Sequence, residues 1–136
     1  MKLTKKQRCE LHAKFAGHCA YCGVLLGDRW HADHMEAVWR EPERVDGKYS
    51  GAIILGRPEN HAISNMMPAC VPCNLSKAAM PLEVWRERIA GHVNSLNSYH
   101  PIYRLAKSYG LIAETGKPVV FHFETVGPLS PFTHRK

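Results

Sequence analysis

Two Cys-x-x-Cys pairs constrain this chain of 136 residues more than any other feature. They are Cys19-Ala20-Tyr21-Cys22 and Cys70-Val71-Pro72-Cys73. Four thiolates in two pairs match the tetrahedral coordination of Zn²⁺, with bonds of about 2.3 Å. A thioredoxin-like redox motif is the alternative for either pair, but it needs a βαβ setting and no duplicate. We expect one structural zinc ion, because four thiolates leave no open coordination position.

Composition and charge narrow the class of protein further. Apolar residues make up 45% of the chain and charged residues 22%, which argues against wholesale disorder. A formal net charge of +6 and a pI near 9.2 favour attraction of polyanions such as nucleic acids. Solubility alone is the competing explanation for the basic residues near the N-terminus. They are Lys2, Lys5, Lys6, Arg8 and Lys14.

The sequence also bears on where the protein is located. It contains no run of about 18 apolar residues, and its first residues lack the pattern of a secretory signal. We expect a soluble, cytoplasmic protein without membrane contact. In that reducing compartment, paired cysteines favour metal binding over disulfides.

The N-terminal half predicts one helix and one hairpin. Thr4 and Gln7 form a capping-box pattern that opens a helix over 5–15, and Gly17 can terminate it. Cys9 lies inside this helix and is expected to pack on its apolar face. Residues 24–26 and 30–35, separated by a Gly-Asp turn signal, predict a hairpin that carries the first cysteine pair.

The rest of the chain predicts a long loop, helices and a strand. Residues 38–64 are rich in Gly and Pro and predict a loop with one short strand within 52–55. A short helix follows from the second cysteine pair up to residue 79. Pro81 is expected to open a new helix. The apolar stripe of that helix, assigned to the core, is Leu82, Trp85, Ile89 and Val93.

Towards the C-terminus, a helix is predicted over 102–109 and closed by Gly110. Alternating residues over 119–124 predict an edge or half-buried strand. The expected fold class is α+β. Residues 1–80 would form the core, and 81–136 would be an extension packed on that core, not an independent domain.

One further motif lies between and around the cysteine pairs. Asp33-His34 is followed by Asn65 and then by Cys70-Val71-Pro72-Cys73-Asn74-Leu75-Ser76-Lys77. In order and local spacing, this pattern resembles the HNH endonuclease family, also called His-Me finger or ββα-metal nucleases. The resemblance covers roughly residues 15–77, about half the chain. It implies a small ββα-metal core with a four-cysteine zinc site.

The resemblance also implies a role for each motif residue. His34 would be the general base, and Asn65 would pin the loop and orient His34. Asp33 and Asn74 would bind a catalytic Mg²⁺ or Mn²⁺. Lys77, one helical turn beyond Asn74, would contact phosphate. The family further implies products with 5′-phosphate and 3′-hydroxyl ends, and double-stranded DNA as the expected substrate.

The residue types suit that chemistry, because hydrolysis of a phosphodiester needs a deprotonated water and stabilisation of the departing oxygen. An imidazole titrating near neutrality can take the proton, and carboxylate and amide oxygens suit a hard cation. Alternatives remain for single residues. Asp33 could be a surface turn residue, and His34 a satisfied core histidine. Asn74 could simply cap a helix.

Two positions remain open within the motif itself. The segment between His34 and Asn65 is longer than in small family members, so Asn60, followed by His61, competes with Asn65. His31 lies two residues before Asp33 on the same strand face. It could assist the metal, contact a phosphate or merely pack.

Two other classes of function compete with a nuclease. A non-catalytic zinc module that binds nucleic acid or a protein explains the cysteines and the charge, but not the Asp-His pair and the two asparagines. A zinc-stapled assembly or packaging factor would use residues 81–136 as a partner surface. Small free-standing nucleases of this kind are common in phage genomes, so the resemblance implies a phage-like member acting in the host cytoplasm, with phage packaging or replication proteins as candidate partners.

Overall fold

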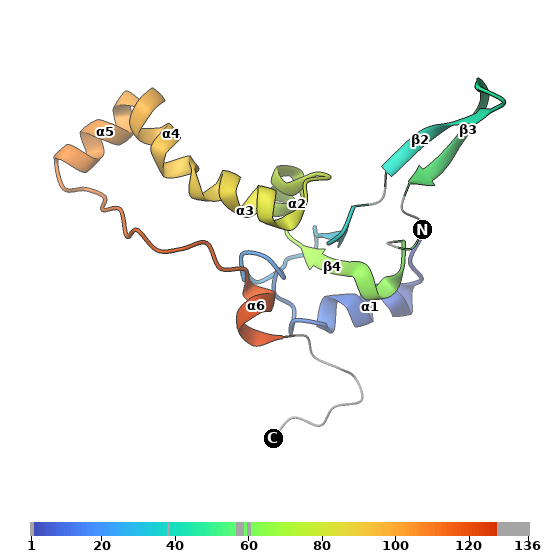
Figure 1. Cartoon of the computed structure of the whole chain (residues 1–136). Coiled ribbons are helices and arrows are strands. Elements are labelled where there is room, and N and C mark those ends of the chain that lie inside the picture. Colours follow the sequence, from blue (N-terminus) through green and yellow to red (C-terminus); the bar gives the residue numbers. More distant parts are fainter. Residues whose placement is uncertain (1, 38, 57–58, 60, 128–136) are drawn as a thin grey trace. The chain divides into compact units, whose positions relative to one another are not determined.

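A computed structural model describes residues 2–37, 39–56, 59 and 61–127. The chain forms two compact units: residues 82–120 make up one, and the described parts of 1–81 and 121–136 make up the other. Within these residues the secondary structure consists of helices and two antiparallel two-stranded sheets (Figure 1). The predicted α+β class is therefore confirmed.

The first unit is built around the ribbon of β1 (His31–His34) and β4 (Met66–Ala69). The strands are antiparallel, with His31 opposite Ala69 and His34 opposite Met66. The predicted hairpin between 24–26 and 30–35 is wrong, because Leu25 forms an isolated bridge with His18 instead. The first cysteine turn is bonded to β4 directly, through the amide of Ala20 and the carbonyl of Pro68 at 2.8 Å. A long-range pairing thus replaced the local one.

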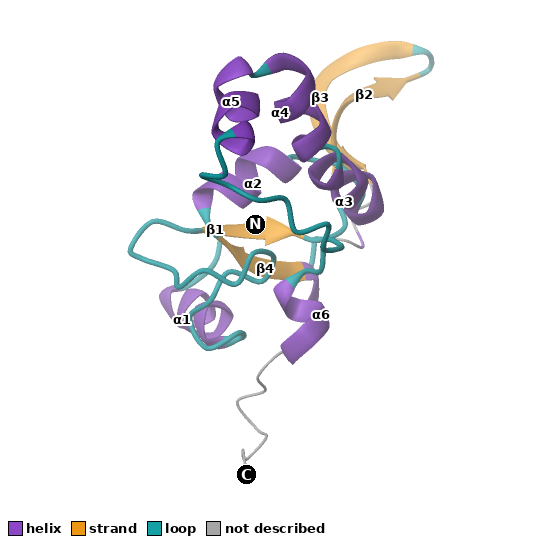
Figure 2. Ribbon diagram, turned by 90° about the vertical axis from the view of Figure 1, so that its left-hand side faces the viewer, coloured by secondary structure: helices purple, strands orange, loops and turns teal. Residues whose placement is uncertain are grey.

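Two helices flank this ribbon. α1 (Lys5–Ala13) has the predicted capping box, since the Thr4 hydroxyl accepts from the Gln7 amide at 3.1 Å and the Gln7 side chain accepts from the Thr4 amide at 2.9 Å. α2 (Val71–Lys77) follows β4 at once, as the second cysteine pair predicted. α1 and α2 lie on opposite sides of the ribbon (Figures 1 and 2). Large apolar side chains buried in this unit are Leu11, Phe15, Tyr21, Leu26, Trp30, Met66, Met67 and Phe121.

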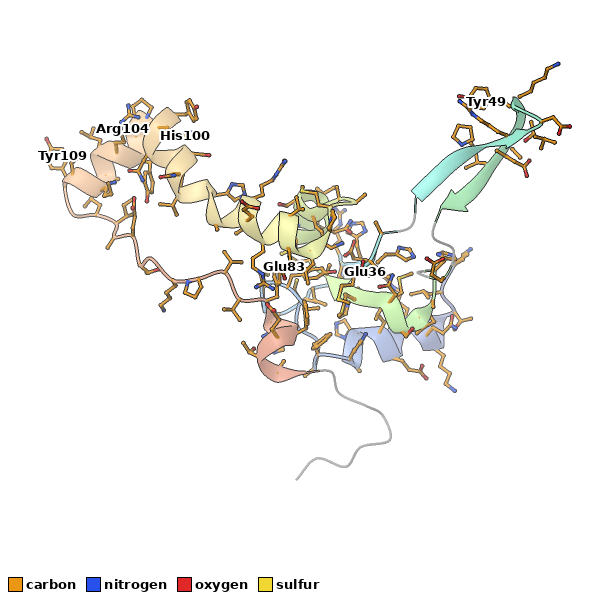
Figure 3. All side chains as sticks on the ribbon, viewed as in Figure 1. Glu36, Tyr49, Glu83, His100, Arg104 and Tyr109 are labelled. Carbon is orange, nitrogen blue, oxygen red and sulfur yellow. The ribbon has the colours of Figure 1, made fainter. Side chains whose placement is uncertain are left out.

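Residues 39–56 form a hairpin where the sequence predicted mostly loop. β2 (Trp39–Val45) pairs with β3 (Lys48–Gly56), and the short strand expected within 52–55 is part of β3. Asp46 and Gly47 make the turn, both with positive φ, as a two-residue hairpin turn requires. The Asp-Gly dipeptide was therefore the overlooked signal. Figure 3 shows Tyr49 next to this turn.

The second unit is helical, with α3 (Leu82–Ala90), α4 (His92–Tyr99) and α5 (Pro101–Ser108). α5 confirms the helix predicted over 102–109, and Gly110 follows it with a φ of 71°. α3 begins one residue after Pro81.

The predicted apolar stripe of that region is only partly confirmed. Trp85 is buried, and Leu82 and Ile89 are half-buried. Val93 remains 42% exposed, so its assignment to the core is wrong. α3 ends at Ala90 and a new helix starts after Gly91, so the helical period of the stripe does not continue to Val93.

The strand predicted over 119–124 is also wrong, because the segment ends in the short helix α6 (His122–Val126). The amides of His122 and Phe123 donate to the carbonyls of Tyr21 and Ala20, at 2.9 and 2.8 Å. Phe121 is buried, with its ring 5.8 Å from that of Tyr21. The alternating aromatic residues thus attach a helical turn to the first cysteine turn. Packing of the remainder of 81–136 on the core stays a prediction.

The lengths and apolar content of the helices bear on the expected absence of membrane contact. None of those in the described part of the chain is long and apolar enough to cross a membrane.

Candidate metal centre and the polar network beside it

The four paired cysteines come together in the first unit. The sulfur atoms of Cys19, Cys22, Cys70 and Cys73 all lie within 4.8 Å of one another. The Sγ atoms of Cys22 and Cys70 are 3.7 Å apart. Tetrahedral zinc with bonds of about 2.3 Å places its sulfur ligands about 3.8 Å apart. The cluster is therefore compatible with the predicted zinc site.

Local backbone structure positions each pair. In the first turn, the Cys19 amide donates to Val24 at 2.8 Å, and Gly23, with a φ of 80°, donates to the Cys19 carbonyl at 3.0 Å. Cys70 is the N-cap of α2, and Cys73 lies in its first turn. The Cys70 amide donates to the Cys19 sulfur at 3.4 Å, so the two pairs are bonded to each other directly.

The thiols hydrogen-bond to one another, so the ionisation of one changes the pKa of the next. A hydrogen bond from Cys73 lowers the pKa of Cys19 to about 4, and the same bond, together with burial, raises the pKa of Cys73. Burial also raises the pKa of Cys70. Several negative charges about 4 Å apart repel one another strongly in a poorly solvated site. A soft dication is the partner that would let all four sulfurs ionise together.

A buried polar network adjoins the cysteine cluster. The Tyr21 hydroxyl donates to Asp33 Oδ2 at 2.5 Å, and the Lys77 ammonium lies 3.2 Å from the same oxygen. The three side chains are 2%, 7% and 0% exposed, respectively. Burial raises the pKa of Asp33, while the Tyr21 hydrogen bond and the Lys77 charge counteract that rise. Lys77 also donates to the His34 carbonyl at 2.9 Å, so it ties α2 to β1.

This network corrects the role assigned to Lys77. The sequence predicted a contact with phosphate, but the side chain is fully buried and its ammonium is bound inside the unit. A buried lysine requires a carboxylate partner, which Asp33 supplies. The three-residue spacing from Asn74 predicts that Lys77 lies one helical turn further along α2. It does not predict whether the Lys77 side chain points to solvent or into the unit.

His34 is paired with His61, a histidine outside the motif. His34 Nε2 lies 3.0 Å from His61 Nδ1, and the two rings are stacked with centroids 5.2 Å apart. Burial lowers the pKa of His34, and the neighbouring His61 lowers it further. The motif assigns no role to His61, which follows Asn60, the competitor of Asn65. Asn60 lies outside the described residues.

Asn65 anchors the loop that follows β1. Its side-chain oxygen accepts from the Glu36 amide at 2.9 Å, and its side-chain nitrogen donates to the Glu36 carbonyl at 2.7 Å. The Met35 amide donates to the Asn65 carbonyl at 2.9 Å. Figure 3 marks Glu36 in this loop. Such loop anchoring is what the motif implied for Asn65; an effect on the chemistry of His34 stays a prediction.

Asn74 and His31 complete the predicted set. Asn74 lies within α2, whose N-cap is Cys70, so the helix-cap alternative for Asn74 is wrong. Asn74 is half-buried, and its side-chain amide makes no hydrogen bond to any residue that the structure describes. His31 is exposed at the start of β1. Comparisons of the chain with protein-family models, with curated proteins and with solved structures found no match.

Removing zinc is expected to unfold the first unit, because the binding free energy of a closed four-thiolate site, about 10–16 kcal/mol in small domains, is part of the folding free energy. Circular dichroism with a strong chelator should show loss of helix and strand, restored by added Zn²⁺. Cys70→Ser should not retain one zinc per chain, whereas Cys9→Ser should, since Cys9 is outside the cluster. An unchanged spectrum after complete zinc removal would contradict this expectation.

Tyr21→Phe should lower the free energy of unfolding by about 2 kcal/mol, because it removes a hydrogen bond to a buried carboxylate. Urea denaturation with zinc in excess measures the change. Tyr49→Phe is the matched control, since that hydroxyl accepts from Arg44 on an exposed hairpin and should cost less than about 0.5 kcal/mol. Equal losses in the two variants would rule out a structural role of the buried network.

Proposed function

We propose that this chain is a metal-dependent HNH endonuclease that hydrolyses phosphodiester bonds of DNA. The observation that carries the proposal is the double hydrogen bond of Asn65 to the backbone of Glu36, two residues after His34. In the motif, the middle asparagine holds the loop that follows the histidine.

The order of elements supports the same proposal. β1 carries Asp33 and His34, β4 begins directly after Asn65, and α2 carries Asn74. β1 and β4 are antiparallel neighbours, and Lys77 bonds α2 to β1. In this proposal the three elements make up the ββα core of the family. The cysteine cluster would fix the start of α2, and with it Asn74, one residue beyond Cys73.

His34 would accept the proton of the attacking water. Its Nε2 contacts His61 Nδ1, so the nitrogens of this pair outside that contact are Nδ1 of His34 and Nε2 of His61. Nδ1 is then the atom of His34 that takes the proton. The contact with His61 would keep the imidazole in one orientation, and Asn65 would hold the chain that follows it.

Asp33 and Asn74 would hold a single Mg²⁺ or Mn²⁺. Tyr21 and Lys77 both contact Oδ2 of Asp33, so Oδ1 is the oxygen that would bind the cation. Asn74 would contribute its side-chain oxygen, which makes no hydrogen bond to the described residues. Oxygen ligands suit a hard cation. When bound, the cation supplies the positive charge that stabilises the departing oxygen.

The substrate class follows from charge and resemblance together. A net charge of +6 favours a polyanion, and the motif belongs to enzymes that cut DNA. His31 is exposed at the start of the same strand as His34, and it would contact a flanking phosphate.

His34→Ala is expected to lower the rate of plasmid cleavage in Mg²⁺ or Mn²⁺ by about 10²- to 10⁴-fold, the usual contribution of a general base. Bound zinc and the circular dichroism spectrum should be unchanged. His92→Ala is the matched control, because His92 is exposed on α4 and contributes nothing to the proposed site. Cleavage by the His34 variant at the rate of the unmodified protein would refute the assigned base and favour a non-catalytic nucleic-acid-binding module.

The pH dependence of cleavage should show the effect of His61 on the pKa of His34. Only neutral His34 can act as the base, so activity falls as pH drops through its pKa. Because that pKa is lowered from the ordinary 6.5, the acidic limb should have its midpoint below pH 6.5. His61→Ala removes burial and a neighbouring charge that both lower the pKa, so the midpoint should move to higher pH. An acidic limb unchanged by His61→Ala, with His100→Ala as control, would show that the contact does not tune His34.

A further inference from the structure

A cavity of about 380 Å³ lies between α1 and the residue that precedes β1. Its lining consists of Lys5, Arg8, Cys9, His12 and Trp30. The four residues from α1 are spaced i, i+3, i+4 and i+7, so they share one face of the helix. Trp30 is buried and forms the apolar wall. A volume of this size is within the range of pockets that hold small ligands.

The rim of this cavity carries positive charge and no carboxylate. Arg8 lies over the Trp30 ring, with Cζ 3.9 Å from the ring centroid, and donates to the Trp30 carbonyl at 2.9 Å. The guanidinium is thereby fixed in place, yet the side chain remains exposed. Lys5 is exposed, and its ammonium forms no ion pair with any described residue. The His12 ring is 5.5 Å from that of Trp30.

These features together select a particular ligand chemistry. A guanidinium fixed over an indole ring provides a stacking surface for a planar base. The Lys5 ammonium, unpaired among the described residues, and the remaining N–H groups of Arg8 suit a phosphate. A nucleotide combines both properties. A peptide carboxylate would satisfy the charges but would leave the stacking surface unused.

We propose that this cavity binds one nucleotide of a nucleic-acid strand, with its phosphate between Lys5 and Arg8 and its base stacked on the Arg8 guanidinium. The identity of the strand rests on the nuclease function proposed above. Trp30 and His34 are four residues apart across β1, a distance of about 13 Å in an extended strand. Since each strand of DNA carries one phosphate per 3.4 Å of helix axis, this corresponds to roughly four nucleotides. The cavity would therefore hold a nucleotide that flanks the cleaved bond.

Charge reversal on α1 tests the phosphate contact. The protein is the full zinc-loaded chain carrying His34→Ala, and fluorescence anisotropy measures its binding to short labelled single-stranded and duplex DNA. Lys5→Glu should weaken binding about tenfold and reduce the salt slope by about one. Lys6→Glu is the matched control, because it makes the same charge change one residue along the helix, outside the cavity. Near a helix N-terminus, either new carboxylate is tolerated.

Alkylation of Cys9 tests occupancy of the cavity itself. Cys9 is exposed and lines the cavity, whereas the other four cysteines belong to the metal cluster. Iodoacetamide should therefore modify Cys9 selectively in the zinc-loaded chain. Saturating DNA should slow that reaction about tenfold or more. Polyglutamate at the same charge concentration should leave the rate unchanged.

Three results would overturn the proposal. They are equal weakening by Lys5→Glu and Lys6→Glu, a Cys9 alkylation rate that DNA does not change, and equal protection by polyglutamate, which would indicate a site for acidic peptides. The outcome is separable from that of the proposed function. Protection of Cys9 with no effect of His34→Ala on cleavage would keep the nucleotide site and remove the assigned base. Loss of cleavage in His34→Ala without protection of Cys9 by DNA would keep the assigned base and remove the nucleotide site.

Discussion

Four sulfur atoms join two segments of this chain that are 48 to 51 residues apart in sequence. Closing a loop of that length costs conformational entropy, and a small unit has little apolar core with which to offset it. A metal ion bound by the four thiolates would supply that free energy. Cys73 lies in the first turn of α2, and Ala20, next to Cys19, bonds to Pro68 in β4. The start of α2, and with it the position of Asn74, depends on this attachment.

A buried ion pair makes a second attachment, between α2 and β1. Lys77 is fully buried and bonds both to Asp33 and to the carbonyl of His34, so it fixes α2 against β1. An unpaired ammonium could not be buried there, because its desolvation would cost several kcal/mol. Tyr21, from the first cysteine turn, reaches the same carboxylate. The cysteine turn, β1 and α2 therefore meet at Asp33, beside the histidine on which the proposed chemistry depends.

Three groups at the candidate site have different surroundings. His34 is half-buried and stacked on His61, Asn65 is fully engaged in holding the loop at Glu36, and the Asn74 amide makes no hydrogen bond to the described residues. The basic cavity on α1 adds a second surface to the same unit, connected to His34 by the short strand β1.

The sequence by itself determined the features that depend on neighbouring residues or on the number of cysteines. The spacing of the cysteines predicted their cluster, Thr4 and Gln7 predicted the start of α1, and the second cysteine pair predicted α2. Tertiary structure decided what depends on distant partners: β1 pairs with β4 and not with 24–26, Lys77 turns inward to Asp33, and His61 stacks on His34. Hydrophobic period and motif spacing specify which residues share an element. They do not specify which distant element that face will meet, because packing and burial across long loops settle that choice.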